Sequence, residues 1–154
     1  RINVESAEEM FTKVMEFRSE MDIFIGVAAV ADYRPKQVAK EKIKKNDESM
    51  NLSLIKNPDI ISKVAAMTKK PFTVGFAAET NSVVENGREK LRRKKLDLLF
   101  ANNAIDTFNS DNITVTAIDQ NSEYQLGPAN KSVVARKMIE LISAALEEDA
   151  TEKS

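Results

Sequence analysis

Apolar runs of strand length alternate with amphipathic segments along most of the chain. Residues 22–30, 72–78 and 96–103 are almost continuously apolar, which is typical of strands buried on both faces, as in a parallel sheet. Around them lie four segments that we interpret as helices: 6–17, 57–70, 82–95 and 130–149. This alternation of helices with buried strands predicts an α/β fold.

The starts of three predicted helices carry capping signals. Two of them place a Ser three residues before a Glu, the spacing of a capping box: Ser6–Glu9 and Ser82–Glu85. A third start has Asn57 followed by Pro58, which we interpret as the N-cap and the first helical position.

The remaining segments are shorter or more polar. Residues 1–4 are interpreted as the end of a strand, and 50–56 as a strand with alternating polarity. Two further strands, 112–118 and 123–126, are close enough in sequence to form a hairpin. Residues 31–49 are rich in lysine and are expected to form a long loop.

Together these elements predict a single domain over residues 1–154. We expect a doubly wound, Rossmann-like architecture. It would have a mostly parallel sheet, helices on both faces and a C-terminal β-hairpin. In sheets of this kind, ligands bind beyond the carboxyl ends of the strands.

A twin motif stands at two of those strand ends. The sequence reads GVAAVAD at 26–32 and GFAAET at 75–80. Small residues there would give a ligand room to approach the backbone, or they would let helices pack closely on the strands. Asp32 and Glu79 would bind ribose hydroxyls, or serve as a helix cap or loop ion pair. Phe76 would stack on a base or belong to the core.

The composition excludes several kinds of site. The chain has no His and no Cys, so a Ser-His-Asp triad, a thiolate nucleophile and a Cys-based metal site are impossible. The four glycines are isolated, so no glycine-rich phosphate loop is present. The net charge of −1 and the short apolar runs give no support for binding to nucleic acid or insertion in a membrane. We expect a cytoplasmic protein.

Basic residues gather in two segments. Residues 36–45 hold five lysines, and residues 88–95 hold six basic side chains on a predicted helix. Lys90 and Lys94 are four residues apart and therefore share one face of that helix. The two clusters would grip a polyphosphate, or they are a solvated loop and a solvated helix face.

Six sequence motifs point to a known family. GVAAVADYRP, EKIKK, IKNPDI, VGFAAET, KLRRKKLDLLFAN and FNSDN occur in this order. In these motifs and their intervals the chain closely resembles bacterial phosphopantothenoylcysteine synthetase, the phosphopantothenate–cysteine ligase of coenzyme A biosynthesis. The resemblance implies that the carboxylate of 4′-phosphopantothenate attacks CTP to give an acyl-cytidylate and pyrophosphate. The amine of cysteine then displaces CMP, and Mg²⁺ assists.

The resemblance also assigns roles to residues. A cytosine pocket is expected from the backbone of Gly26, Val27 and Ala28 and from the side chain of Phe76, and Asp32 is expected to bind the nucleotide. Four further residues match a stretch that contacts CTP: Pro58, Asp59, Ile60 and Ile61.

The lysines receive two different roles from the resemblance. Lys90 and Lys94 match basic contacts to the nucleotide, whereas Lys42 matches a catalytic lysine on a flap that closes over the intermediate. We therefore expect residues 36–49 to be mobile until a nucleotide binds. The ligands of the metal are not identified by this resemblance.

The family's N-terminal Gly-Pro-Thr start and Ser-Asn-x-Ser-Ser-Gly loop have no counterpart in this sequence. That loop supplies an Asn that acts on the acyl intermediate, so we expect the chain alone to be inactive in ligation. The alternative function is a CTP-binding or dimerisation module of the enzyme. The resemblance further implies a homodimer and a fused or associated phosphopantothenoylcysteine decarboxylase domain.

Overall fold

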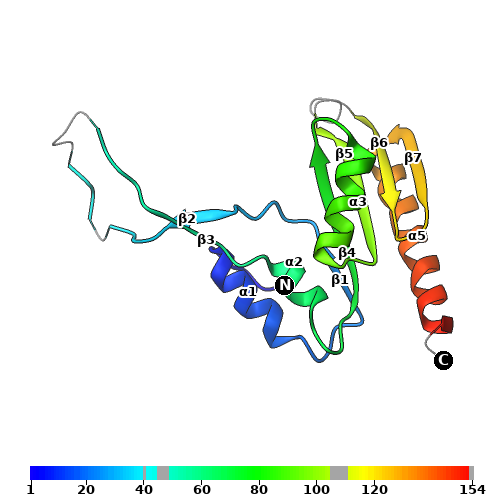
Figure 1. Cartoon of the computed structure of the whole chain (residues 1–154), viewed down its shortest axis with the longest axis horizontal. Helices are drawn as coiled ribbons and strands as arrows, with labels where there is room; N and C mark the ends of the chain where they lie inside the picture. The colour runs from blue at the N-terminus through cyan, green and yellow to red at the C-terminus, as the bar shows by residue number, and fades with distance from the viewer. Residues whose placement is uncertain (40, 45–48, 105–110, 153–154) are drawn as a thin grey trace.

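A computed structural model describes residues 1–39, 41–44, 49–104 and 111–152. Its centre is a five-stranded sheet with the strand order β1-β4-β5-β6-β7 (Figure 1). The strands are β1 (Ile23–Gly26), β4 (Phe72–Glu79), β5 (Leu98–Asn103), β6 (Asn112–Ile118) and β7 (Glu123–Asn130). The first three run parallel, and β6 and β7 continue the sheet as an antiparallel pair. The predicted sheet and its C-terminal hairpin are therefore confirmed.

Helices cover both faces of this sheet. Helices α2 (Ile60–Ala65) and α3 (Val83–Lys94) lie on one face, and α5 (Lys131–Glu152) lies on the other (Figure 1). The core beneath α2 and α3 consists of Ala65, Ala77, Leu91, Leu96, Leu99, Ala101 and Ile118. The core beneath α5 consists of Phe72, Val74, Leu98, Phe100, Val115, Ala117, Val134 and Ile142. Strands β4 and β5 are thus buried on both faces, as their continuous apolar runs predict, whereas the same prediction is wrong for β1, which lies at the edge of the sheet with no fully buried residue.

The capping predictions have mixed outcomes. Helix α1 (Ala7–Glu16) starts as predicted, because the Ser6 hydroxyl accepts a hydrogen bond of 3.2 Å from the Glu9 N–H. The capping box predicted at the start of α3, Ser82 with Glu85, is wrong. Ser82 has a left-handed backbone, with φ 44°, and its side chain caps nothing. A capping Ser normally has extended backbone, and this conformation aims its hydroxyl elsewhere.

The predicted N-cap of the second helix is also wrong. Asp59 caps α2, and its carboxylate accepts a 3.2 Å hydrogen bond from the Ser62 N–H. Pro58 consequently lies before the cap rather than in the first turn. The Asn57 N–H donates to the carbonyl of Asp32 at 2.8 Å, and the Asn57 amide binds the carbonyl of Ala31. Tertiary contacts therefore occupy Asn57, and the helix begins two residues later than its spacing predicts.

The structure departs from the sequence prediction in two further places. Residues 1–4 form no strand, because they pair with no neighbouring strand of the sheet. Within the expected loop 31–49, Tyr33–Pro35 forms strand β2, which pairs antiparallel with β3 (Leu54–Lys56). These strands are the base of an arm, residues 33–56, that projects away from the sheet (Figure 1). Residues 40 and 45–48 of the arm lie outside the described residues.

Candidate functional site

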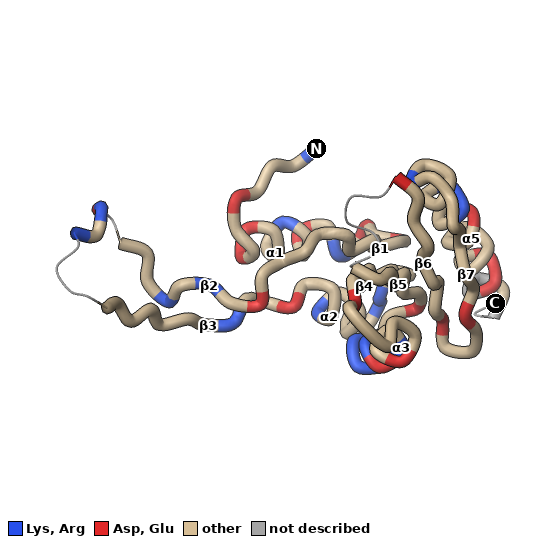
Figure 2. Tube along the Cα trace, turned by 90° about the horizontal axis from the view of Figure 1, so that it is seen from above, with Lys and Arg blue, Asp and Glu red and all other residues tan. Residues whose placement is uncertain are grey.

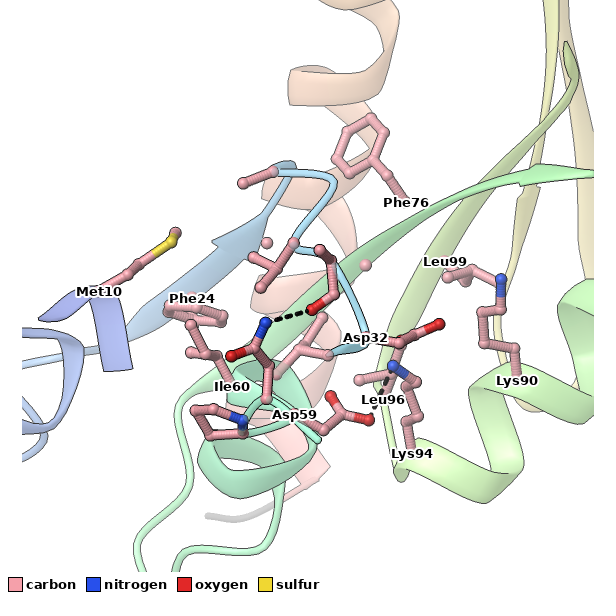
Figure 3. A pocket seen from close by; sticks show the side chains of 18 residues that line it. Met10, Phe24, Asp32, Asp59, Ile60, Phe76, Lys90, Lys94, Leu96 and Leu99 are labelled. Carbon is pink, nitrogen blue, oxygen red and sulfur yellow. Dashed lines mark hydrogen bonds and ion pairs between the residues drawn. The ribbon is translucent and has the colours of Figure 1, made fainter. Parts of the chain in front are cut away.

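A pocket enclosing about 160 Å³ lies at the carboxyl end of β1 and beside the middle of β4 (Figure 3). Its lining includes all but two of the site residues predicted from the sequence. These are Gly26, Ala28, Asp32, Pro58, Asp59, Ile60, Ile61, Phe76, Lys90 and Lys94. They come from segments far apart in the chain, and the parallel pairing of β1 with β4 brings Gly26 at the end of β1 beside Gly75 in the middle of β4.

The two exceptions are Val27 and Lys42. Val27 stands between two lining residues but is 63% exposed and is not among the residues that line the pocket. Lys42 is exposed on the arm, outside the lining of the pocket. The expected closing movement over residues 36–49 involves residues that the structure leaves undescribed, and the role of Lys42 stays a prediction.

The two glycines of the twin motif lie side by side in the floor of the pocket. Gly26 and Gly75 are register partners of β1 and β4. A Cβ on Gly75 would lie 2.7 Å from Cδ1 of Leu96, and one on Gly26 would lie 3.0 Å from Cδ1 of Ile61. Real Cβ atoms do not approach other atoms as closely as 2.7 Å. Close packing of side chains on the strands is therefore one established reason for Gly at both positions.

Phe76 belongs in part to the core. Its neighbours Gly75 and Ala77 face α3, so alternation along β4 turns the Phe76 ring to the opposite face. There the ring packs on Phe100, with centroids 5.4 Å apart and planes inclined at 43°. In Figure 3 the ring points away from Lys90 and Lys94. The core interpretation of this residue is correct, although it also borders the pocket.

Two lysines of α3 line the pocket, and each forms an ion pair with a carboxylate. The Lys94 ammonium lies 2.9 Å from the Asp59 carboxylate, and the Lys90 ammonium lies 2.8 Å from the Glu79 carboxylate. Both lysine side chains are less than one-third exposed, so the stems are held against the protein. Figure 2 shows further basic residues along α3 and the arm. The sequence left two kinds of role open for Glu79: ribose binding, or a helix cap or loop ion pair. In the structure Glu79 forms an ion pair, with Lys90.

The ionisation of Asp59 is shifted by these contacts. Partial burial raises the pKa of its carboxyl, but hydrogen bonds from Lys94 and Ser62 and the charge of Lys94 outweigh burial. The pKa of Asp59 is therefore lowered from its usual 3.8. Asp59 is a carboxylate at neutral pH, and it holds Lys94 at the pocket while it caps α2.

Sequence reasoning missed several residues at this site. Met10, Phe24 and Leu96 add apolar lining, and nothing in their spacing marks them as pocket residues rather than core. Asn57 also lines the pocket, although its position before Pro58 made it look like a helix cap. A metal site is not evident: no three acidic side chains converge among the residues that the structure describes.

Comparison with known families identifies the chain. The model of the family described as DNA/pantothenate metabolism flavoprotein C-terminal domain (DFP) matches residues 1–146. The chain belongs to this DFP family. The match covers every residue of the pocket described above.

Among curated DFP proteins, the chain is similar to coenzyme A biosynthesis bifunctional protein CoaBC from several bacteria. It is 47% identical to the protein of Vibrio vulnificus (strain CMCP6) over 152 residues, which cover 95% of this chain and 38% of that protein. The protein of Escherichia coli (strain K12) is 40% identical over 155 residues, with 96% and 38% covered. The chain therefore spans little more than a third of the length of these relatives.

Solved structures share the DFP fold. The crystal structure of the C-terminal domain of CoaBC superimposes with a TM-score of 0.77 at 32% identity and covers 96% of this chain and 66% of that one. The DNA/pantothenate metabolism flavoprotein from Streptococcus pneumoniae gives a TM-score of 0.76 at 22% identity, covering 92% and 71%. A complex of the Cab2 mutant H337A with phosphopantothenate-cysteine gives 0.72 at 16%, covering 99% and 55%. The last two demonstrate the fold alone.

No described helix is long and apolar enough to cross a membrane.

Proposed function

We propose that this chain is the nucleotide-binding part of a CTP-dependent phosphopantothenate–cysteine ligase in coenzyme A biosynthesis. The observation that carries the proposal is the pocket itself. It gathers the residues that the family resemblance assigns to CTP, drawn from four separate segments of the chain. Membership of the DFP family and similarity to the CoaBC proteins support the same pathway.

In this proposal the floor of the pocket recognises cytosine. Backbone N–H and C=O groups near Gly26, held at the end of β1, and near Ala28, in the turn that follows, would read the edge of the base. A base with another pattern of donors and acceptors would leave buried groups unpaired, which costs about 1–3 kcal/mol per group. This is the reason to expect CTP to bind more tightly than UTP or ATP.

The lysines would neutralise the triphosphate. Before binding, Asp59 and Glu79 hold Lys94 and Lys90 at the pocket. Phosphate oxygens would replace these carboxylates as partners, so the ammonium groups need move little. Since the cations are already oriented, less conformational entropy is lost when the nucleotide binds.

Mg²⁺ would enter with the triphosphate, bound mostly by phosphate oxygens and one or two carboxylates, as is usual for this ion. The Asp32 carboxylate at the pocket fits such a role, because it forms no ion pair among the described residues. The ion would neutralise charge on the phosphates. Lys42 would act later, when the arm approaches the pocket and its ammonium reaches the acyl and phosphoryl groups.

The chemistry proceeds in two steps. A 4′-phosphopantothenate carboxylate oxygen attacks the α-phosphorus of CTP, and pyrophosphate leaves. The cysteine amine then attacks the acyl carbon of the acyl-cytidylate, and CMP leaves with the bonding electrons while the amine loses a proton. Neither step requires a His or Cys side chain, so the residues of this chain would act through position and charge.

Calorimetric titration with CTP, UTP and ATP, each with Mg²⁺, tests the nucleotide proposal. Lys94→Gln should bind CTP at least about ten-fold more weakly, because it removes a charge-assisted hydrogen bond worth about 1.5–3 kcal/mol. Arg92→Gln is the matched control: Arg92 is on the same helix, is exposed and does not line the pocket. Equal affinity for the three nucleotides, or equal losses in the two variants, would refute the proposal.

The arm supports a second role, contact between two copies of the chain. Val38 is 84% exposed and Leu52 57% exposed, and Met50 beside them is exposed as well. Large apolar side chains gathered on a projecting ribbon are typical of an interaction surface. We propose a homodimer, which sedimentation of the wild type and of Val38→Ser/Leu52→Ser would test. A monomeric wild type would refute it.

The decarboxylase partner is proposed from the bifunctional relatives.

A further inference from the structure

Arg34 lies at the base of the arm and contacts three parts of the protein. Its Nη1 donates to the carbonyl of Lys56 at 2.8 Å and to Oδ1 of Asn57 at 3.2 Å. Its Nη2 pairs with the carboxylate of Glu8 on α1. The Arg34 side chain is only 28% exposed, so the guanidinium is largely enclosed by these partners. Arg34 is not among the residues that line the pocket.

Asn57 connects this guanidinium to the pocket. Its Nδ2 donates to the carbonyl of Ala31 at 2.7 Å, and its backbone N–H donates to the carbonyl of Asp32 at 2.8 Å. These two bonds join segment 31–32 to segment 57–59. Both segments line the pocket, the first with Asp32 and the second with Asp59. The separation of the two carboxylates therefore depends on how Asn57 is held.

Arg34 and Ala31 hold the two ends of the Asn57 amide. A guanidinium offers only N–H donors, so the amide turns its oxygen toward Arg34. The amide nitrogen then faces Ala31, whose carbonyl can only accept, so both partners favour the same orientation. Without Arg34 the amide oxygen loses its donor, and Asn57 is then held only through its bonds to the 31–32 segment. A donor outside the pocket thus fixes the position of the residue that joins the two segments.

We propose that Arg34 is a positioning residue for the nucleotide pocket. Acting through Asn57, it sets the distance between the Asp32 and Asp59 segments and fixes the base of the arm against them. The proposal rests on nucleotide binding at this pocket, as argued above. It assigns Arg34 an effect on CTP affinity although Arg34 does not touch the nucleotide.

The ion pair between Arg34 and Glu8 should contribute little to the pocket. The Glu8 carboxylate is 60% exposed, and an exposed pair of this kind contributes little, because water screens it. If Arg34 served mainly to attach α1, losing Glu8 would be as harmful as losing the guanidinium. If Arg34 orients Asn57, losing Glu8 should matter little. Glu8→Gln is therefore the matched control.

The experiment measures CTP affinity by calorimetry and the unfolding midpoint for the whole chain and three variants. In Arg34→Lys the charge remains, but one ammonium on a shorter stem replaces two separate nitrogens, so it cannot keep the bonds of Nη1 to Asn57 and Lys56 together with the ion pair of Nη2 to Glu8. We expect CTP to bind about ten-fold more weakly, as when a hydrogen bond to a charged group is lost. Glu8→Gln should stay within about two-fold of the wild type, since exposed pairs contribute little.

A third variant, Asn57→Asp, keeps the bond to Arg34 but replaces the donor to Ala31 by an oxygen. It should weaken CTP binding as Arg34→Lys does, and the double variant should lose no more than either single one. Arg34→Lys that lowers the unfolding midpoint but binds CTP like the wild type would overturn the proposal, as would a Glu8→Gln effect of equal size or fully additive losses. A wild type that fails to bind CTP would overturn the proposed function as well, which distinguishes the two failures.

Discussion

Gly75→Ala should destabilise the protein because the space above this strand position is already filled. A Cβ there would lie 2.7 Å from Cδ1 of Leu96 and 3.0 Å from Cδ1 of Leu99. Neither leucine can move aside easily, since Leu96 is 1% exposed and Leu99 is fully buried. Forcing an extra methyl group into such a core costs about 1–3 kcal/mol.

One effect acts in the opposite direction. Ala restricts the unfolded chain more than Gly, which stabilises the folded state by about 0.4–1 kcal/mol where the backbone conformation is compatible. Taking the middle of each range, about 2 and about 0.7 kcal/mol, the net loss for Gly75→Ala is about 1.3 kcal/mol. For a chain of this size, that lowers the midpoint of thermal unfolding by about 2–8 °C.

Gly26→Ala is the matched control, because Gly26 is the register partner of Gly75 on the neighbouring strand β1. Its Cβ would meet one close atom, Cδ1 of Ile61 at 3.0 Å, and Ile61 is only partly buried. The steric cost of the added methyl group and the lower entropy of the unfolded chain should then nearly cancel. The free energy of unfolding should change by no more than about 0.5 kcal/mol. Ile61→Val removes that Cδ1 atom, so any cost of Gly26→Ala should shrink in an Ile61→Val background.

Circular dichroism during heating and urea titration would measure the stability of the wild type, Gly75→Ala, Gly26→Ala, Ile61→Val and the Gly26→Ala/Ile61→Val double variant. The reasoning is refuted if Gly75→Ala is as stable as the wild type, or if Gly26→Ala costs more than Gly75→Ala. Either result would mean that the room above Gly75 is open in solution. The twin glycines would then be explained by ligand access rather than by packing.

Three further outcomes are expected. Asp59→Asn keeps an N-cap but loses the ion pair with Lys94, so at neutral pH it should cost about 0.2–1 kcal/mol. Because the pKa of Asp59 is lowered in the folded chain, its stabilisation is present above pH 3.8 and is lost as the pH falls further; urea midpoints across this range should fall less steeply in the variant. Ser6→Ala should destabilise α1 and cost about 1 kcal/mol in urea titration, whereas Ser82→Ala, whose hydroxyl caps nothing, should cost less. In a ligase that includes the upstream segment, Lys42→Gln should lower the rate of pyrophosphate release more than the affinity for CTP, and equal losses in both would contradict its late role.

Much of the fold is readable from local pattern. The buried strands are nearly continuous apolar runs, and Ser6 with Glu9 marks the first helix, because both signals act within a few residues. The twin motif also places the pocket, since Gly26 and Gly75 are partners on neighbouring parallel strands and both line it. The family motifs added the individual residues of the site.

Other features required the tertiary structure. Asn57 and Asp59 are both good capping residues two positions apart, and only the bonds of Asn57 to Ala31 and Arg34 assign the cap to Asp59. Strand β2 exists because β3 returns alongside it, a pairing that its own residues do not encode.

The twin glycines show the same limit at the site itself. Their likeness predicted two equivalent strand ends, but Gly26 is the last residue of β1 whereas Gly75 lies in the middle of β4. Whether the missing side chains leave room for a ligand or for a neighbour depends on what lies above them. Leu96 and Ile61 fill that space, and they reach it from the connection before β5 and from α2. Local pattern therefore determined the helices and the strands of the main sheet, whereas contacts between distant segments decided two of the caps, the strands of the arm and the floor of the pocket.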